Sequence, residues 1–197
     1  MMFDDKPILL SLGFDENDYQ AYNQNKITYN KRISKIEALA RQESKLNYCY
    51  YCKKDVSSFC NSHSVPQFCL RRIAVNGKVY YANKLINLPS LGTEQGVNKA
   101  GTFQIICRDC DSKIFQDYEN PDAYYARPSG QILAQIAMKD YLQMIYKRLY
   151  EDALYRLAGT ELGASKDWVQ HKHQLISLDL AEYTSEFKRA QIGSLGK

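Results

Sequence analysis

Two stretches decide the fold, CYYCKKDVSSFCNSHSVP at residues 49–66 and GTFQIICRDCDSKIFQDYE at residues 101–119. Each stretch contains one C-x2-C pair, and the four cysteines are Cys49, Cys52, Cys107 and Cys110. Two residues between thiolates let a tight turn direct both sulfurs at one ion. Thiols in a cytosolic chain stay reduced, so these pairs favour a metal over disulfides. The sequence therefore predicts one structural Zn²⁺ bound by these four cysteines.

A second ligand set is also compatible with the spacing. Cys49 and Cys52 could combine with Cys60 and His63 in a C-x2-C-x7-C-x2-H finger. That arrangement would leave the second C-x2-C pair without a partner. We therefore expect Cys60 and Cys69 to be ordinary buried residues, which is the usual state of a single cysteine.

Short strand patterns lie between the two cysteine pairs. Residues 78–82 (KVYYA) follow the turn signal Asn76-Gly77, and residues 102–106 (TFQII) lead into the second pair, which opens a helix. A metal knuckle, a hairpin and a second knuckle at a helix start are the arrangement of a treble clef. We expect an α+β fold in which a small treble-clef zinc core is flanked by N-terminal and C-terminal helices.

Helical periodicity appears on both sides of this core. In residues 27–45, apolar side chains recur at steps of three and four residues, and a longer apolar stripe runs from Leu133 through Ile136 to Leu157. A further helix is predicted from about Asp179 to Gln191. The chain thus divides into an acidic segment with a basic amphipathic helix (1–46), a zinc-bearing core (47–120) and a helical annex (121–197).

Charge is distributed unevenly around a net value of +4. Residues 26–54 contain eight basic residues and two acidic ones. Such a block suits phosphate backbones, although a solvated helix face would have the same composition. The candidate nucleic-acid ligands are Lys31, Arg32, Lys35, Arg41 and Lys45.

Composition and motifs exclude several other classes of protein. The hydrophobic share of 45% with 24% charged residues is typical of a soluble globular chain. No apolar run is long enough for a membrane span, and the first ten residues lack the basic start of a signal peptide, so we expect a cytoplasmic protein without membrane contact. No phosphate-binding glycine loop or dinucleotide fingerprint is present.

Residues 47–120 resemble the zinc-bearing branch of the HNH, or ββα-metal, endonucleases. The resemblance rests on SHSVPQFCLRRI at residues 62–73 and on GTFQIICRDCDSKIFQDYE, which combine a His before an apolar residue and Pro with a second C-x2-C followed by Asp. It implies that His63 is the general base that deprotonates water. It further implies that Asp111 holds a catalytic Mg²⁺ or Mn²⁺ against the scissile phosphate. The middle Asn of the family pattern could be Asn76, Asn83 or Asn87, which all lie between His63 and Cys107, and we select Asn83.

Two positions depart from the family pattern, and one of them is Asp111, which replaces the His or Asn that is commoner at its position. Many members place Asp or His directly before the catalytic His as a second metal ligand, whereas this chain has Ser62, a poorer ligand for a hard cation. Glu119 lies on the same helix face as Asp111 and could reach a metal ion or a structural Arg.

Two functions follow as expectations. The resemblance implies a metal-dependent HNH-type endonuclease that hydrolyses nucleic acid, DNA in the first instance, as a bacterial defence or mobile-element effector. The alternative is a catalytically inactive treble-clef zinc module that binds nucleic acid or a larger protein partner. In either case the C-terminal helices offer a surface for a protein partner.

Overall fold

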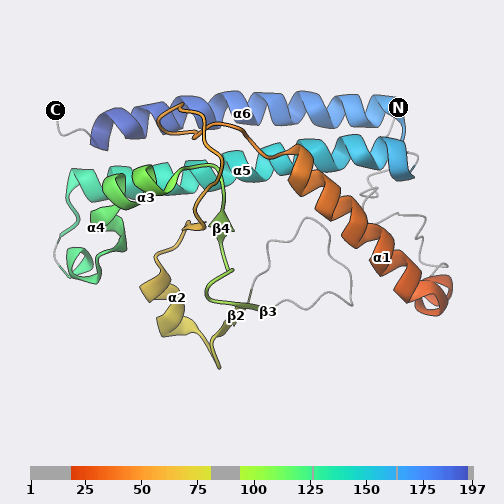
Figure 1. The fold of residues 1–197 in the computed structure, drawn as a ribbon, viewed down its shortest axis with the longest axis horizontal. Helices are drawn as coiled ribbons and strands as arrows, with labels where there is room; N and C mark the ends of the chain where they lie inside the picture. Colours follow the sequence, from red (N-terminus) through yellow and green to blue (C-terminus); the bar gives the residue numbers. More distant parts are fainter. Residues whose placement is uncertain (1–18, 81–93, 126, 163, 195–197) are drawn as a thin grey trace. The chain divides into compact units, whose positions relative to one another are not determined.

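The computed structural model describes residues 19–80, 94–125, 127–162 and 164–194, and these residues form an α+β fold that is mostly helical (Figure 1). Its strands form two small sheets of two strands each, β1 with β4 and β2 with β3. The elements in chain order are α1 (Tyr19–Glu43), β1 (Ser62–His63), α2 (Gln67–Ile73), β2 (Lys78–Tyr80), β3 (Glu94–Gly96), β4 (Thr102–Phe103), α3 (Arg108–Ile114), α4 (Gln116–Glu119), a 3-10 turn (Pro121–Tyr124), α5 (Gly130–Leu162) and α6 (Lys166–Ser194).

The chain separates into two compact units. The described part of the first unit consists of residues 19–44 and 150–176, and that of the second consists of residues 45–80, 94–149 and 177–194. Both long helices, α5 and α6, contribute to each unit. The division into three consecutive segments stays a prediction.

The first unit is built on the predicted amphipathic helix. Ile33, Ile36 and Ala40 of α1 are buried in one cluster with residues of α5, among them Leu154 and Leu157. The three- and four-residue spacing of these side chains places them on one helix face, which explains why the segment is helical. The helix predicted for residues 27–45 is confirmed, but its described part begins earlier, at Tyr19.

The second unit has its core around the short sheet of β1 and β4. These antiparallel strands place Ser62 opposite Phe103 and His63 opposite Thr102. Phe103 is fully buried, together with aromatic and aliphatic side chains from α3 to α6; they include Phe115, Tyr118, Met138, Leu142, Ile145 and Phe187. The strand predicted for residues 102–106 is therefore present but ends at Phe103.

The second sheet starts at the predicted turn. Val75 and Lys78 exchange backbone hydrogen bonds across Asn76 and Gly77, whose φ angles are +52° and +72°. Two consecutive residues in the left-handed region are what a tight type I′ turn requires, and Asn-Gly adopts this conformation readily. The strand predicted for residues 78–82 is described as far as Tyr80.

Two sequence predictions about the long helices need correction. The predicted apolar stripe includes Leu133 and Ile136, but these residues are 53% and 37% exposed. The buried face of α5 includes Gln135 and Lys139. These two polar residues have internal partners, so an apolar pattern could not identify that face.

The second correction concerns the start of the last helix. It begins at Lys166 and not near Asp179, because residues 167–178 contain no Pro or Gly that would interrupt it. Asp179 instead forms an ion pair with Arg148, with 3.0 Å between Nε and Oδ2. Among the described helices, none has the length and apolar character that a membrane crossing requires.

Candidate metal centre and the neighbouring lysine cluster

The four predicted cysteines come together in one cluster. The Sγ atoms of Cys49, Cys52, Cys107 and Cys110 all lie within 4.8 Å of one another. The first pair lies on a tight turn in which the Lys53 amide donates to the Cys49 carbonyl at 2.8 Å. Lys53 adopts φ of +60°, and the Cys49 amide in turn donates to the carbonyl of Lys54 at 2.8 Å.

The second pair lies at the start of α3, where Cys107 is the N-cap residue. Its backbone amide donates to Cys49 Sγ at 3.3 Å, so one knuckle supplies a hydrogen bond to a sulfur of the other. The two segments are also joined by the Tyr50 amide, which donates to the Ile105 carbonyl at 2.7 Å. Amide hydrogen bonds to sulfur stabilise the thiolate form that binds a metal.

The donor set fits a soft or borderline cation. Burial, followed by hydrogen bonds to neighbouring sulfurs, raises the pKa of Cys110 above the ordinary thiol value. Sulfurs this close are stabilised as thiolates only when a cation offsets their charge. Four cysteines in this arrangement can bind a metal such as zinc. The finer assignment of the arrangement as a treble clef stays a prediction.

Cys60 and His63 are outside this cluster. The Cys60 thiol donates to the Ile106 carbonyl at 3.4 Å, and burial raises its pKa to about 12, with a further contribution from the negative charge of Asp111. The Cys60 sulfur is not among the four that lie within 4.8 Å of one another. These contacts favour the set of two C-x2-C pairs over the finger that includes Cys60.

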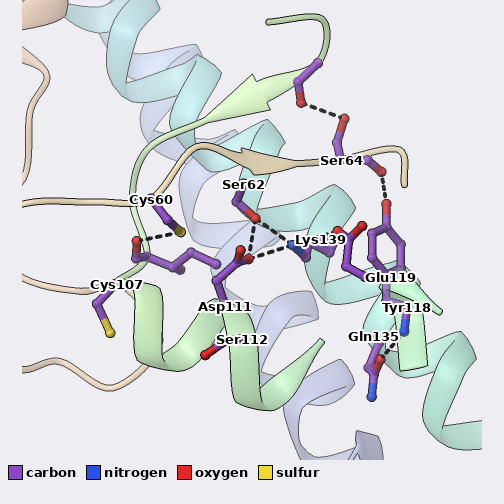
Figure 2. Close-up of polar contacts among 12 residues, drawn as sticks. Cys60, Ser62, Ser64, Cys107, Asp111, Ser112, Tyr118, Glu119, Gln135 and Lys139 are labelled. Carbon is purple, nitrogen blue, oxygen red and sulfur yellow. Dashed lines mark hydrogen bonds and ion pairs between the residues drawn. The ribbon is translucent and has the colours of Figure 1, made fainter. Parts of the chain in front are cut away.

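Asp111 has two close partners that the sequence did not indicate (Figure 2). Its Oδ1 atom accepts a hydrogen bond from Ser62 Oγ at 2.6 Å and pairs with Lys139 Nζ at 2.7 Å. Lys139 Nζ also donates to Ser62 Oγ at 2.6 Å. The three side chains come from α3, β1 and α5, so this cluster joins three elements of the second unit.

Lys139 has no solvent-exposed side-chain surface, whereas the Asp111 side chain is 25% exposed. The ammonium lies 4.4 Å from the ring centroid of Phe115 and 5.3 Å from that of Tyr118. Its second carboxylate neighbour is Glu119, with 3.7 Å between Nζ and Oε1. A buried ammonium is tolerated only with such partners. The sequence suggested a metal ion or a structural Arg as the partner of Glu119, whereas the base found beside it is Lys139.

The hydrogen-bond partner of His63 is a backbone carbonyl and not the Asp111 carboxylate. Ser62 is buried and points toward Asp111, and successive residues of a strand point to opposite faces. The ring of His63 is half-buried, and its Nε2 lies 3.2 Å from the carbonyl oxygen of Val97. Asn83 lies outside the described residues. The catalytic roles assigned to these residues stay predictions.

The candidate nucleic-acid ligands lie at the surface. Lys31, Arg32 and Lys35 on α1 are exposed, as are Arg41 and Lys45. Two of them have protein partners, since Arg32 donates to the Glu161 carbonyl and Arg41 pairs with Glu37 at 3.2 Å. Exposed side chains of this kind can bind phosphate after a small rearrangement.

A scan against family models, a search of curated proteins and a search of solved structures each found no match. The resemblance to HNH endonucleases therefore rests on residues 62–73 and 101–119 alone.

Proposed function

We propose that this chain is a metal-stabilised nucleic-acid-binding module that does not itself hydrolyse phosphodiester bonds. The observation that carries the proposal is the position of Lys139. Its ammonium lies within 2.7 Å of both Asp111 Oδ1 and Ser62 Oγ. These are the two side chains that a catalytic cation would use if the family pattern applied.

A divalent cation at Asp111 Oδ1 and this ammonium compete for the same oxygen atom. If a cation bound there, the fully buried Lys139 would lose its closest carboxylate and keep only Glu119, at 3.7 Å, as an acidic neighbour. Leaving a buried charge without its partner costs about 3–5 kcal/mol. Weak binding of Mg²⁺ by one carboxylate and water does not offset a cost of that size. Asp111 therefore has a structural role, with Lys139 as its counterion.

Nucleic acid is the partner that the charge favours. The exposed basic residues of α1 can neutralise backbone phosphates and release counterions, which gives affinity without sequence preference. We expect three substitutions, Lys31→Gln, Lys35→Gln and Arg41→Gln, to weaken binding about tenfold in combination and to make it less sensitive to salt.

The matched control is Lys166→Gln, Lys188→Gln and Arg189→Gln on α6. This control removes the same charge from exposed positions, and its arginine pairs with Glu186 as Arg41 pairs with Glu37. Fluorescence anisotropy on two unrelated duplexes at several salt concentrations measures both effects. Equal losses in the two triple variants would show that the bases of α1 are only a solvated surface.

The absence of hydrolysis is tested on supercoiled DNA with Mg²⁺ or Mn²⁺. We expect the wild type, with its metal bound, to nick no faster than the buffer. Nicking by the wild type that is lost in both His63→Ala and Asp111→Asn would overturn the proposal and support the endonuclease.

The endonuclease remains the second candidate because one observation favours it. The Asp111 side chain is partly exposed, and Asp111 lines a cavity of about 530 Å³ that Arg108 also lines. A carboxylate and a base at one open cavity can serve phosphoryl chemistry. Activity would require that a cation displace Lys139, and the nicking assay decides this question.

A further inference from the structure

The cavity beside Asp111 has walls from three parts of the second unit. It has a volume of about 530 Å³, which is in the range of sites for small ligands. Its lining includes Phe59 and Asn61 before β1, Gln104 after β4, and Arg108 and Asp111 of α3. Most of these side chains are polar, so an apolar peptide or lipid is not a suitable occupant.

Arg108 is the charged group that is available for a ligand. It is exposed, and within the described part of the chain no hydrogen bond or ion pair is found for its guanidinium. Asp111 on the same wall does not oppose an anion, because Lys139 offsets its charge. A guanidinium that lacks a protein partner suits a phosphate, to which it can donate two parallel hydrogen bonds.

Two side-chain amides, those of Asn61 and Gln104, belong to residues of the same lining. Gln104 Nε2 donates to Asn61 Oδ1, which fixes the two side chains against each other. The arrangement leaves the Asn61 amide nitrogen as a donor and the Gln104 oxygen as an acceptor. A donor beside an acceptor matches the hydrogen-bonding edge of a nucleobase. Phe59 on the same lining is half-buried and offers an aromatic ring for stacking.

From these contacts we infer that the cavity binds one unpaired nucleotide of a single-stranded nucleic acid, with its base on Phe59 and the amide pair and its phosphate on Arg108. The inference rests on the proposed function and specifies the form of nucleic acid. A base inside a duplex has its edge already paired and its faces stacked, so it cannot use this lining. A second cavity shares Phe59 and Arg108 with the first but is also lined by Asp55 and Asp109. The negative charge of these two carboxylates disfavours the binding of a phosphate group there.

The experiment compares a labelled single-stranded 12-mer with the duplex of the same sequence, using the full chain with its metal bound. The variants are Arg108→Gln and Phe59→Leu. The control is Lys113→Gln, which removes one charge from an exposed position of the same helix outside the cavity. We expect each cavity variant to weaken single-strand binding about tenfold and duplex binding less than twofold. The control should change both affinities to the same small extent.

The possible results separate this inference from the proposed function. A wild type that binds neither probe overturns both. A wild type that binds both probes, with cavity variants that resemble Lys113→Gln in every affinity, overturns the nucleotide site alone. Circular dichroism and metal content identify a variant that misfolds; Gln104→Ala then replaces it, and we expect the same selective loss of single-strand binding.

Discussion

Two clusters of the second unit each bring together groups that need a cation to offset negative charge, but the source of the cation differs. The four cysteines place sulfurs within 4.8 Å of one another, and their thiolate forms need a cation from solution. Asp111, Ser62 and Glu119 surround a cation that belongs to the chain, the ammonium of Lys139. Both clusters use α3, since Cys110 and Asp111 are adjacent residues of that helix.

The difference concerns what each cluster requires of its surroundings. An external ion can be removed by a chelator or replaced by another metal, whereas a lysine side chain cannot leave. A metal bound by the cysteine cluster would therefore make stability depend on metal supply, whereas the Lys139 cluster needs no such supply. Substitutions that remove one partner at a time test whether the two clusters are separate in this way.

The largest effect is expected for Cys107→Ser. Loss of one thiolate weakens the metal site, and binding energy at such a site is folding energy, about 10–16 kcal/mol for structural zinc. We expect the variant to lose about one metal ion per chain and to unfold the knuckles and α3. Metal analysis and circular dichroism measure these changes. Cys60→Ser is the control and should keep the metal. A Cys107→Ser variant that retained its metal would instead support the alternative ligand set, which includes Cys60 and His63.

A smaller but still large effect is expected for Lys139→Met. The substitution keeps the length of the side chain but leaves Asp111 without its counterion, which should lower the free energy of unfolding by about 3 kcal/mol. Urea denaturation of the metal-bound chain measures it. We expect the metal content to stay at the wild-type value, and a loss of metal here would show that the two clusters are coupled.

Adding Asp111→Asn to Lys139→Met separates the lost charge pair from lost packing. The double variant has neither charge, so we expect it to recover about 2 kcal/mol of the loss. Lys113→Met is the matched single control because its side chain is exposed, and it should change stability by less than about 0.5 kcal/mol. No recovery in the double variant would mean that Lys139 acts through packing alone.

The smallest effect is expected for Ser62→Ala. The hydroxyl donates to Asp111 and accepts from Lys139, but both charged groups keep each other when it is removed. We expect a loss of about 1 kcal/mol in urea denaturation, the usual contribution of one hydrogen bond. A loss as large as that of Lys139→Met would show that the serine, not the ion pair, holds β1 against α3.

Prediction from the sequence succeeded where the pattern was local. C-x2-C spacing identified the four cysteines as one set, and Asn76-Gly77 identified a turn by its backbone preference alone. Asp111 was singled out, but its partner was missed. Lys139 is 28 residues away and belongs to a helix whose buried face also includes Gln135.

A charged residue within an apolar helix pattern was the available signal for Lys139. It lies between Met138 and Leu142, both fully buried, but spacing alone does not distinguish a buried lysine from an exposed one. The distinction requires knowledge of the carboxylate that faces it. Long-range pairing of this kind depends on the tertiary fold and not on local pattern.

The order of these residues along the chain has a consequence for biosynthesis. All four cysteines and Asp111 precede Lys139, so on a ribosome the metal ligands and the carboxylate are made before the ammonium that neutralises it. A nascent chain could bind its metal early, yet α3 would still carry an uncompensated acid until α5 packs against it. The second unit can therefore finish folding only after α5, which carries Lys139, has been synthesised.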